Sequence, residues 1–310
     1  MLKTMKRILL FLLILLASCS PPPQPQIAGT VDLNDLQPLP TPANQQAVPL
    51  RVAVAAVISP KGTVESYAPF LNYLEAKLNR PIILVQRRTY LEINDLIEHG
   101  EVDLAFVCTS AYVEGHNTFG MELLAAPQVD GKTTYNSYLI VPANSPAQSM
   151  SDLRGKVFAF TDPISLSGRV YPTYVVHQLG FAPEEFFART FFTYSHDEAI
   201  RAVAGGVADG AAVDSLVYEF AIARDPSLKE KVRVIHISPD FGIPPVVVSP
   251  FTRPQVKDEL QSLLLEMAED PAARDALASI GVERFVLIND SAYNGVRDLM
   301  GLVPASAVQP

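Results

Sequence analysis

A serine-rich turn after a short apolar run is the first feature of this chain that could do chemistry. Val157–Phe160 combines aromatic and β-branched residues, as a buried strand does. Ser165 and Ser167 follow it, Gly168 would let a ligand approach the backbone, and residues 169–179 favour a helix. Hydroxyls in front of a helix N-terminus, where backbone N–H groups lack partners and the helix dipole is positive, predict a site for a small oxyanion. An ordinary serine-capped helix gives the same pattern, so the turn alone leaves both interpretations open.

Strands and helices alternate along most of the chain. Apolar, β-branched runs indicate strands, and stretches with apolar residues at helical spacing lie between them. The alternation predicts an α/β fold with a parallel, doubly wound sheet, in which ligands bind at the carboxyl ends of strands. We expect strands at 51–58, 82–85, 103–107, 138–141, 157–160, 190–193, 209–213, 232–237 and 246–248, and a loop at 108–112. We expect helices at 64–78, 91–98 and 169–179, a further helix that ends at 204, and helical structure that begins at 254.

Two breaks in composition, at 142–149 and 241–245, divide this α/β pattern. We expect lobe 1 to comprise residues 50–142 plus 245–310, and lobe 2 to comprise residues 143–244. Two connections between two lobes form a hinge, and strand-end loops from both lobes then face a central cleft that can close on a ligand.

The first fifty residues predict export and anchoring. Lys3, Lys6 and Arg7 precede the apolar run 8–16, which is too short to span a membrane and suits a signal peptide. The following Leu-Ala-Ser-Cys19 resembles a bacterial lipobox, which implies a signal peptide at 1–18 and lipid attachment to Cys19, although a plain secretory signal remains the alternative. Residues 19–49 are rich in proline and predict an extended tether. We therefore expect a membrane-anchored lipoprotein of the cell envelope that faces the periplasm or the cell exterior.

Charge and motif content narrow the function classes. The formal net charge of −9 argues against nucleic acid as a partner. The chain has two cysteines, so lipidation of Cys19 leaves no intramolecular disulfide, and no His/Cys group has zinc spacing. Ser167, His196 and Asp214 could be imagined as a catalytic triad, but no Gly-x-Ser-x-Gly elbow is present. We expect a binding protein without enzymatic activity, cofactor or metal.

A series of short motifs in a fixed order carries a family resemblance. The order is similar to that of the phosphonate- and phosphite-type periplasmic binding proteins of ABC importers, which have the two-lobed type II periplasmic-binding fold. The resemblance covers residues 50–300 approximately, nearly the whole predicted domain. The motifs are Tyr67–Leu71, Gly100–Ala105, Tyr135 before Leu139–Val141, Ser151–Lys156, Phe158–Phe160 with Asp162-Pro163 and Ser165–Gly168, Ser195–Asp197, and Ala208–Asp214.

The resemblance also implies which residues bind the ligand. Tyrosine and serine hydroxyls and a histidine would donate to anionic oxygens. Asp214 would accept from a protonated oxyanion or a ligand amine. Core packing of the tyrosines and helix capping by the polar residues are the ordinary structural alternatives. By motif position, the ligand-binding residues are Tyr90, Tyr135, Ser165, Ser167, His196 and Asp214.

Two departures from the family pattern concern the ligand. Leu166 interrupts what is usually a run of three hydroxyl residues, and Cys108, followed by Thr109, stands where a glycine is common. Leu166, Cys108 and Thr109 are therefore possible ligand contacts. The thiol of Cys108 would suit thiophilic species if it faces the cleft, and arsenite-binding periplasmic sensors resemble the same family. The expected function is capture of phosphonate, phosphite or phosphate by a monomeric protein for an ABC permease. The alternative is an arsenite-type sensor that uses Cys108 and signals to a histidine kinase.

Overall fold

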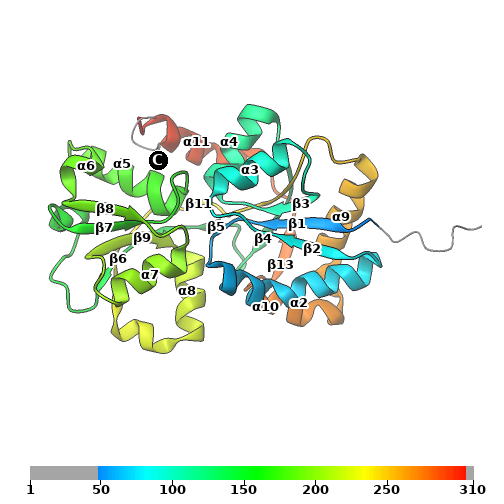
Figure 1. Cartoon of the computed structure of the whole chain (residues 1–310), viewed down its shortest axis with the longest axis horizontal. Helices are drawn as coiled ribbons and strands as arrows, with labels where there is room; N and C mark the ends of the chain where they lie inside the picture. The colour runs from blue at the N-terminus through cyan, green and yellow to red at the C-terminus, as the bar shows by residue number, and fades with distance from the viewer. Residues whose placement is uncertain (1–47, 305–310) are drawn as a thin grey trace, which may run out of the picture. The chain divides into compact units, whose positions relative to one another are not determined.

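Two β-sheets with helices on their faces form the fold in the computed structural model, which describes residues 48–304. Helices cover both faces of each sheet, with α3, α4 and α11 opposite α2 and α10 on the first sheet, and α5 and α6 opposite α7 and α8 on the second (Figure 1). This arrangement confirms the predicted α/β class, but the expectation of a parallel sheet is wrong, because both sheets also contain antiparallel pairs.

The first sheet has the strand order β13-β4-β12-β3-β1-β2. β1 is parallel to β2 and β3, while β12 is antiparallel to β3 and β4. Its strands are β1 (Leu50–Val54), β2 (Ile82–Val85), β3 (Leu104–Phe106), β4 (Glu122–Gln128), β12 (Val246–Val248) and β13 (Arg284–Val286). Its helices are α2 (Pro60–Leu78), α3 (Tyr90–Glu98), α4 (Thr109–Phe119), α9 (Pro254–Glu266), α10 (Arg274–Ser279) and α11 (Asn294–Gly301).

The second sheet has the order β10-β6-β9-β7-β8. The aromatic strand of the serine-rich motif lies inside it, where the rings of Phe158 and Phe187 stack with centroids 4.4 Å apart. Its strands are β6 (Ser137–Pro142), β7 (Val157–Phe160), β8 (Arg189–Phe192), β9 (Gly210–Asp214) and β10 (Val232–Ile237). Its helices are a π-helical turn (Leu166–Val170), α5 (Tyr171–Gln178), α6 (Pro183–Phe186), α7 (His196–Ala204) and α8 (Ser215–Arg224).

A short antiparallel pair connects the two sheets. β5 (Thr134–Tyr135) pairs with β11 (Phe241–Gly242), and Tyr135 lies opposite Phe241. Residues 138–141 are expected in lobe 1, but β6 is hydrogen-bonded to β9 and β10 in the second sheet. The break at 142–149 lies between β6 and β7, which are both strands of the second sheet. Its Pro and Ser residues indicate a loop, but they do not indicate whether that loop joins two lobes. We therefore propose that the lobe boundary lies at β5 and β11.

Three local predictions differ from the structure. β4 has no counterpart among the predicted strands, since its sequence Glu122–Gln128 lacks β-branched residues. Residues 109–112, predicted as loop, begin α4, with Cys108 as the N-cap. The helix expected from 169 starts earlier, as a π-helical turn from Leu166.

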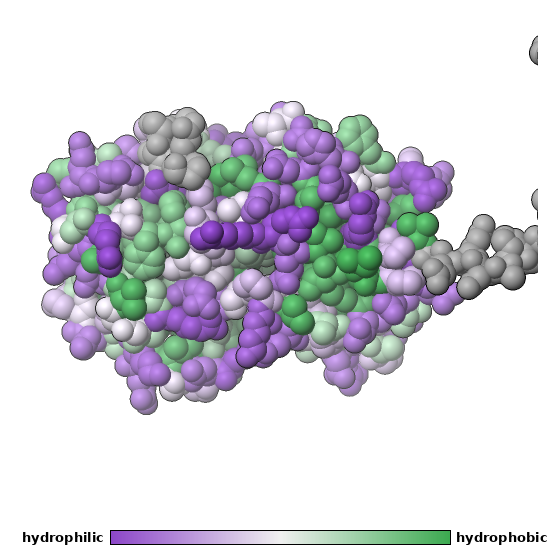
Figure 2. All heavy atoms as spheres, in the orientation of Figure 1, coloured by the Kyte–Doolittle hydropathy of each residue, from purple (hydrophilic) through white to green (hydrophobic). Residues whose placement is uncertain are grey.

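The edge strand β2 exposes apolar surface. Ile83 is 48% exposed, and a hydrophobic patch lies over the region of β2 on the face shown in Figure 2. The strand is followed at once by the exposed Arg87 and Arg88. Charged residues beside an edge strand disfavour pairing with another chain, so the two arginines make pairing of β2 with a second chain less favourable.

Candidate ligand-binding site

The predicted site residues lie where strands end and helices begin. Tyr90 is the first residue of α3 and His196 the first residue of α7. Cys108 caps α4, Ser165 caps the π-helical turn, and Asp214 caps α8. Each helix N-terminus carries a partial positive charge from the aligned backbone dipoles. The fold therefore supplies positive potential here from backbone dipoles.

A cluster of buried side chains from both sheets forms around Tyr135, and we call it the Tyr135 cluster. Burial raises the pKa of Tyr90 and of Tyr135 well above the ordinary phenol value, and the nearby Asp214 and Cys108 raise both further. These electrostatic effects require proximity. Both phenols therefore stay protonated and can donate. The cluster consists of Tyr90, Cys108, Thr109, Tyr135, Ser167 and Asp214.

Several hydroxyls in and beside the Tyr135 cluster are buried without a hydrogen-bond partner in the described part of the chain. A buried hydroxyl with no partner costs about 1–3 kcal/mol, so native structures keep few of them. The hydroxyls of Thr109 and Ser167 lower the pKa of Tyr135 slightly, but neither reaches Tyr135 with hydrogen-bond geometry. A polar ligand accounts best for the unpaired set, which comprises Tyr90 Oη, Tyr135 Oη, Thr161 Oγ1, Ser167 Oγ and Ser195 Oγ.

Asp214 and His196 are joined through the backbone. The Asp214 N–H donates to His196 Nδ1 at 3.0 Å. Burial lowers the pKa of His196 to about 3, so the ring is neutral. A neutral imidazole that accepts at Nδ1 carries its proton on Nε2, so His196 is a donor at that atom.

The Asp214 carboxyl caps α8 and also has a raised pKa. Its Oδ1 accepts from Leu216 N at 2.7 Å and from Val217 N at 3.3 Å, which caps α8. Burial raises the pKa of Asp214 to about 7 against the opposing effect of those two bonds. Near neutral pH the ionised carboxylate can accept a hydrogen bond from a protonated ligand oxygen. The protonated carboxyl can instead donate a hydrogen bond to an ionised ligand oxygen.

Four other predicted residues have structural roles. Ser165 Oγ accepts from Gly168 N at 3.1 Å, and Thr109 Oγ1 donates to the carbonyl oxygen of Gly242 in β11 at 2.8 Å. Leu166 is fully buried in an apolar core that also contains Cys108. Burial raises the pKa of the Cys108 thiol, so it is neutral. Ser165 therefore caps a turn, whereas Ser167 keeps an unpaired hydroxyl.

Gly168 has a different role from the one the sequence suggests. A Cβ at this position would lie 1.8 Å from Thr161 Oγ1 and 2.7 Å from Thr161 Cβ. The glycine is needed because Thr161, at the end of β7, packs directly against the backbone. The expectation that Gly168 makes room for a ligand is therefore wrong.

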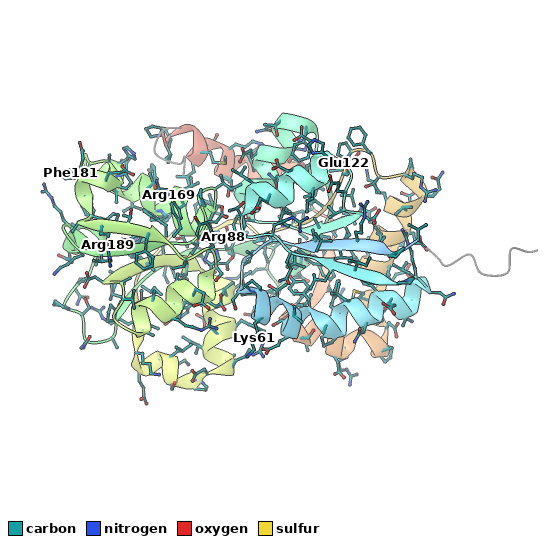
Figure 3. The ribbon with its side chains drawn as sticks, viewed as in Figure 1. Lys61, Arg88, Glu122, Arg169, Phe181 and Arg189 are labelled. Atoms are coloured by element: carbon teal, nitrogen blue, oxygen red, sulfur yellow. The ribbon has the colours of Figure 1, made fainter. Side chains whose placement is uncertain are left out.

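Contacts between the two halves surround the Tyr135 cluster. Asp162 accepts from Tyr90 N at 3.1 Å, and Asp197 accepts from Ser59 N and Ser59 Oγ at 2.8 and 2.7 Å. The Arg88 guanidinium lies 4.0 Å from the centre of the Tyr194 ring, and Figure 3 shows Arg88 over the junction between the sheets. These contacts join the two lobes and keep the cluster buried.

Sequence reasoning gave no site role to Thr161, Asp162 or Ser195. All are buried, and burial raises the pKa of Asp162 to about 6. The Asp-Pro pair after a strand and the serine before a helix are visible in the sequence, but they also mark ordinary turns and caps. Only the packing of the two lobes, which buries all three side chains, distinguishes them from ordinary turn and cap residues.

Residues 48–304 contain no group of three or more His, Cys, Asp or Glu side chains placed to hold a metal ion. They also contain no helix long and apolar enough to cross a membrane. The predicted signal peptide, Cys19 and the tether at 19–49 lie outside the described residues, apart from the last two residues of the tether.

Comparisons with known proteins agree on one family. The model described as "ABC transporter, phosphonate, periplasmic substrate-binding protein" matches residues 52–293. The phosphate-import protein PhnD of Mycolicibacterium smegmatis is 28% identical over 252 residues, covering 75% of this chain and 78% of that protein.

Solved structures share the fold. The binding protein component of an ABC phosphonate transporter from Pseudomonas aeruginosa matches with a TM-score of 0.77 at 22% identity, covering 82% of this chain and 85% of that chain. PhnD1 from Prochlorococcus marinus, in complex with methylphosphonate, matches with a TM-score of 0.72 at 20% identity, covering 81% and 96%. These likenesses confirm the predicted two-lobed α/β fold.

Proposed function

This chain belongs to the family of phosphonate-type periplasmic substrate-binding proteins of ABC transporters, and we propose that it captures a small phosphorus oxyanion in the Tyr135 cluster. The observation that carries the proposal is the set of buried, unpaired hydroxyls on Tyr90, Tyr135 and Ser167. Each can donate to an anionic oxygen, and a hydrogen bond to a charged group is among the stronger ones in proteins.

The chemistry of the site favours an oxyanion that carries a proton. The phenols, the Cys108 thiol and the His196 ring are all neutral. Asp214, with a pKa of about 7, can accept a hydrogen bond from the P–OH group of a monoanionic phosphite, phosphate or phosphonate. Relatives named for phosphate import and solved with methylphosphonate support this ligand class.

The cellular setting completes the proposal. The bound oxyanion passes to an ABC permease, and no chemical step takes place on this chain. The protein works as a monomer, held at the membrane by a lipid on Cys19 after removal of residues 1–18. The lipobox-like Leu-Ala-Ser-Cys19 and the proline-rich stretch that follows it support the anchor.

The arsenite-sensing alternative rests on Cys108. Its nearness to Tyr90 and Tyr135 supports this alternative, but burial raises the pKa of the thiol, whereas thiolate is the form that binds thiophilic species. Oxyanion import therefore explains more of the site than sensing through a histidine kinase does.

Calorimetric titration tests the proposal. We expect the wild-type protein to bind at least one of phosphate, phosphite and methylphosphonate. Ser167→Ala should weaken that binding about 10- to 100-fold, because one donor to a charged group is lost. It should not lower the unfolding free energy of the ligand-free protein, since Ser167 Oγ has no protein partner and its burial without one is itself unfavourable. Ser262→Ala, at an exposed position on α9, is the matched control.

The proposal is wrong if none of the three ligands binds, or if Ser167→Ala and Ser262→Ala behave alike. Binding of arsenite alone, lost in Cys108→Ser, would favour the sensing alternative.

A further inference from the structure

Two acidic residues of lobe 2 lie at the N-termini of two helices of lobe 1. Asp197, in the first turn of α7, accepts from Ser59 N at 2.8 Å and from Ser59 Oγ at 2.7 Å, and Ser59 is the N-cap of α2. Asp162, in the loop after β7, accepts from Tyr90 N at 3.1 Å, and Tyr90 is the first residue of α3. Each acid therefore caps a helix of the opposite lobe at the positive end of that helix.

The helix α2 has no cap from its own segment. The Ser59 side chain makes no capping bond to the first turn of α2, and its hydroxyl donates to Asp197 instead. That first turn also contains no acidic residue. A Cβ added at Gly62, in the same turn, would lie 3.8 Å from Asp197 Oδ2. The carboxylate therefore lies beside the backbone of this turn, and lobe 2 supplies the negative group that α2 lacks.

The helix α3 has a cap of its own and one further donor. Its capping box pairs Thr89 with Glu92 and uses the backbone N–H groups of both residues. The Tyr90 N–H is one of the donors that a helix leaves without an intrahelical partner. Asp162 Oδ2 accepts from it, while Asp162 Oδ1 accepts from Ile164 N at 3.0 Å. The carboxyl is thus held by its own loop in the position that meets α3.

Each of these contacts lies next to a predicted ligand residue. Asp197 follows His196, whose N–H donates to Val57 O of lobe 1 at 2.9 Å. Asp162 binds the backbone of Tyr90, whose buried hydroxyl has no partner. Donor and acceptor belong to different lobes, so the contacts exist only while the lobes touch. Closure of the lobes and placement of Tyr90 and His196 at the site therefore occur together.

We infer that Asp162 and Asp197 are positioning residues that hold the closed form by capping α3 and α2 from the opposite lobe, and that they set the rate at which a bound oxyanion leaves. This inference rests on the proposed function and adds to it two residues that act through others. The open form makes neither contact, so the association rate does not depend on them.

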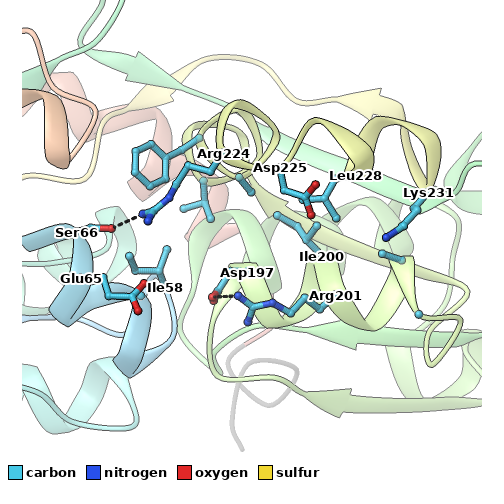
Figure 4. A pocket seen from close by; sticks show the side chains of 16 residues that line it. Ile58, Glu65, Ser66, Asp197, Ile200, Arg201, Arg224, Asp225, Leu228 and Lys231 are labelled. Atoms are coloured by element: carbon cyan, nitrogen blue, oxygen red, sulfur yellow. Dashed lines mark hydrogen bonds and ion pairs between the residues drawn. The ribbon is translucent and has the colours of Figure 1, made fainter.

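Glu198 offers a matched control for Asp197. Both acids lie in the first turn of α7, and both form an ion pair with Arg201, that of Asp197 at 3.1 Å. Figure 4 shows the Asp197–Arg201 pair in a cavity of about 550 Å³ that is lined by residues of α2, α7 and α8. Within residues 48–304, Glu198 makes no hydrogen bond or ion pair with lobe 1. Alanine at either position removes similar interactions within α7, but only the loss of Asp197 frees α2.

Stopped-flow tyrosine fluorescence measures release and association, since the chain contains no tryptophan. Phosphate, phosphite and methylphosphonate are the probes, and the tightest binder of the three is used for the kinetics. We expect Asp197→Ala to speed release about 10- to 100-fold, because two hydrogen bonds to a charged group are lost. The association rate should be unchanged. Glu198→Ala should release the probe at the wild-type rate.

Variants on both sides of the junction test the mechanism. Ser59→Ala should speed release in the wild-type background but add nothing to Asp197→Ala, because the two residues share one contact. Asp162→Ala should also speed release. Asp162→Asn keeps an acceptor for Tyr90 N and should release the probe no faster than the wild type. Burial raises the pKa of Asp162 to about 6, so the closed form already disfavours the charged carboxylate.

The outcomes separate the two proposals. If a probe binds and Asp197→Ala releases it no faster than Glu198→Ala, or if Asp162→Asn behaves like Asp162→Ala, the inference is refuted while the oxyanion site stands. A fall in the association rate that matches the rise in the release rate would also refute it, because it would indicate a damaged site rather than a weaker closed form. If none of the three probes binds, the proposed function fails, and the inference falls with it.

Discussion

Replacing Asp214 by asparagine should make the protein more stable at alkaline pH and not at acidic pH. Asparagine is uncharged, and its Oδ1 can still accept from Leu216 N and Val217 N, as Asp214 does in capping α8. The substitution therefore removes the ionisation of a buried carboxyl while it preserves the helix cap.

The magnitude follows from the shift in pKa. Burial raises the pKa of Asp214 from 3.8 to about 7 in the folded protein. Below pH 3.8 both folded and unfolded chains are protonated, and this group's stabilising preference for the folded state is complete. Between pH 3.8 and 7 unfolding releases a proton, so stability falls by about 1.4 kcal/mol per pH unit. Above pH 7 the loss levels off at about 4 kcal/mol.

Urea unfolding of the wild type and of Asp214→Asn, from pH 4 to pH 8, measures this effect. The difference in unfolding free energy should grow with pH in favour of the variant and level off near pH 7. Asp162, whose pKa is raised to about 6, steepens both curves alike and drops out of the difference. Asp298→Asn, at an exposed position on α11, gives the baseline for the substitution. A difference that is flat across this pH range, or that favours the wild type at pH 8, would refute the reasoning.

Two further variants probe the contacts between lobes and the serine-rich turn. Arg88→Ala removes the cation–π contact with Tyr194 and should speed ligand release about 2- to 30-fold in stopped-flow experiments, whereas Arg87→Ala should not; equal rates would contradict a role in closure. Gly168→Ala should lower the unfolding free energy by about 1–3 kcal/mol in urea titrations, because its Cβ would overlap Thr161. Adding Thr161→Ala should restore part of that loss, and a fully stable single variant would show that the turn has room.

Local patterns were sufficient to predict the elements that position the site. Val157–Phe160 and Ile82–Val85 are strands with the predicted bounds, because each is an apolar run enclosed by turn residues. The family resemblance then implied ligand contacts at His196 and Asp214 by motif position. His196 is the first residue of α7 and Asp214 the N-cap of α8.

What the sequence did not reveal depends on contacts between distant residues. β6 reads as a strand from its own residues, but its place in the second sheet is set by pairing with β9 and β10. Gly168 reads as a ligand contact until the side chain of Thr161 is placed against it. Asp162 looks like a turn residue until Tyr90, from the other lobe, donates to it.

The serine-rich turn offers the proposed site fewer donors than the family pattern does. Ser165 is engaged as a cap, and Ser167 keeps its hydroxyl unpaired. Between them, Leu166 packs into the same apolar core as Tyr135 instead of offering a third hydroxyl. An oxyanion in the proposed site would therefore depend more on donors outside the turn, above all the unpaired phenols of Tyr90 and Tyr135.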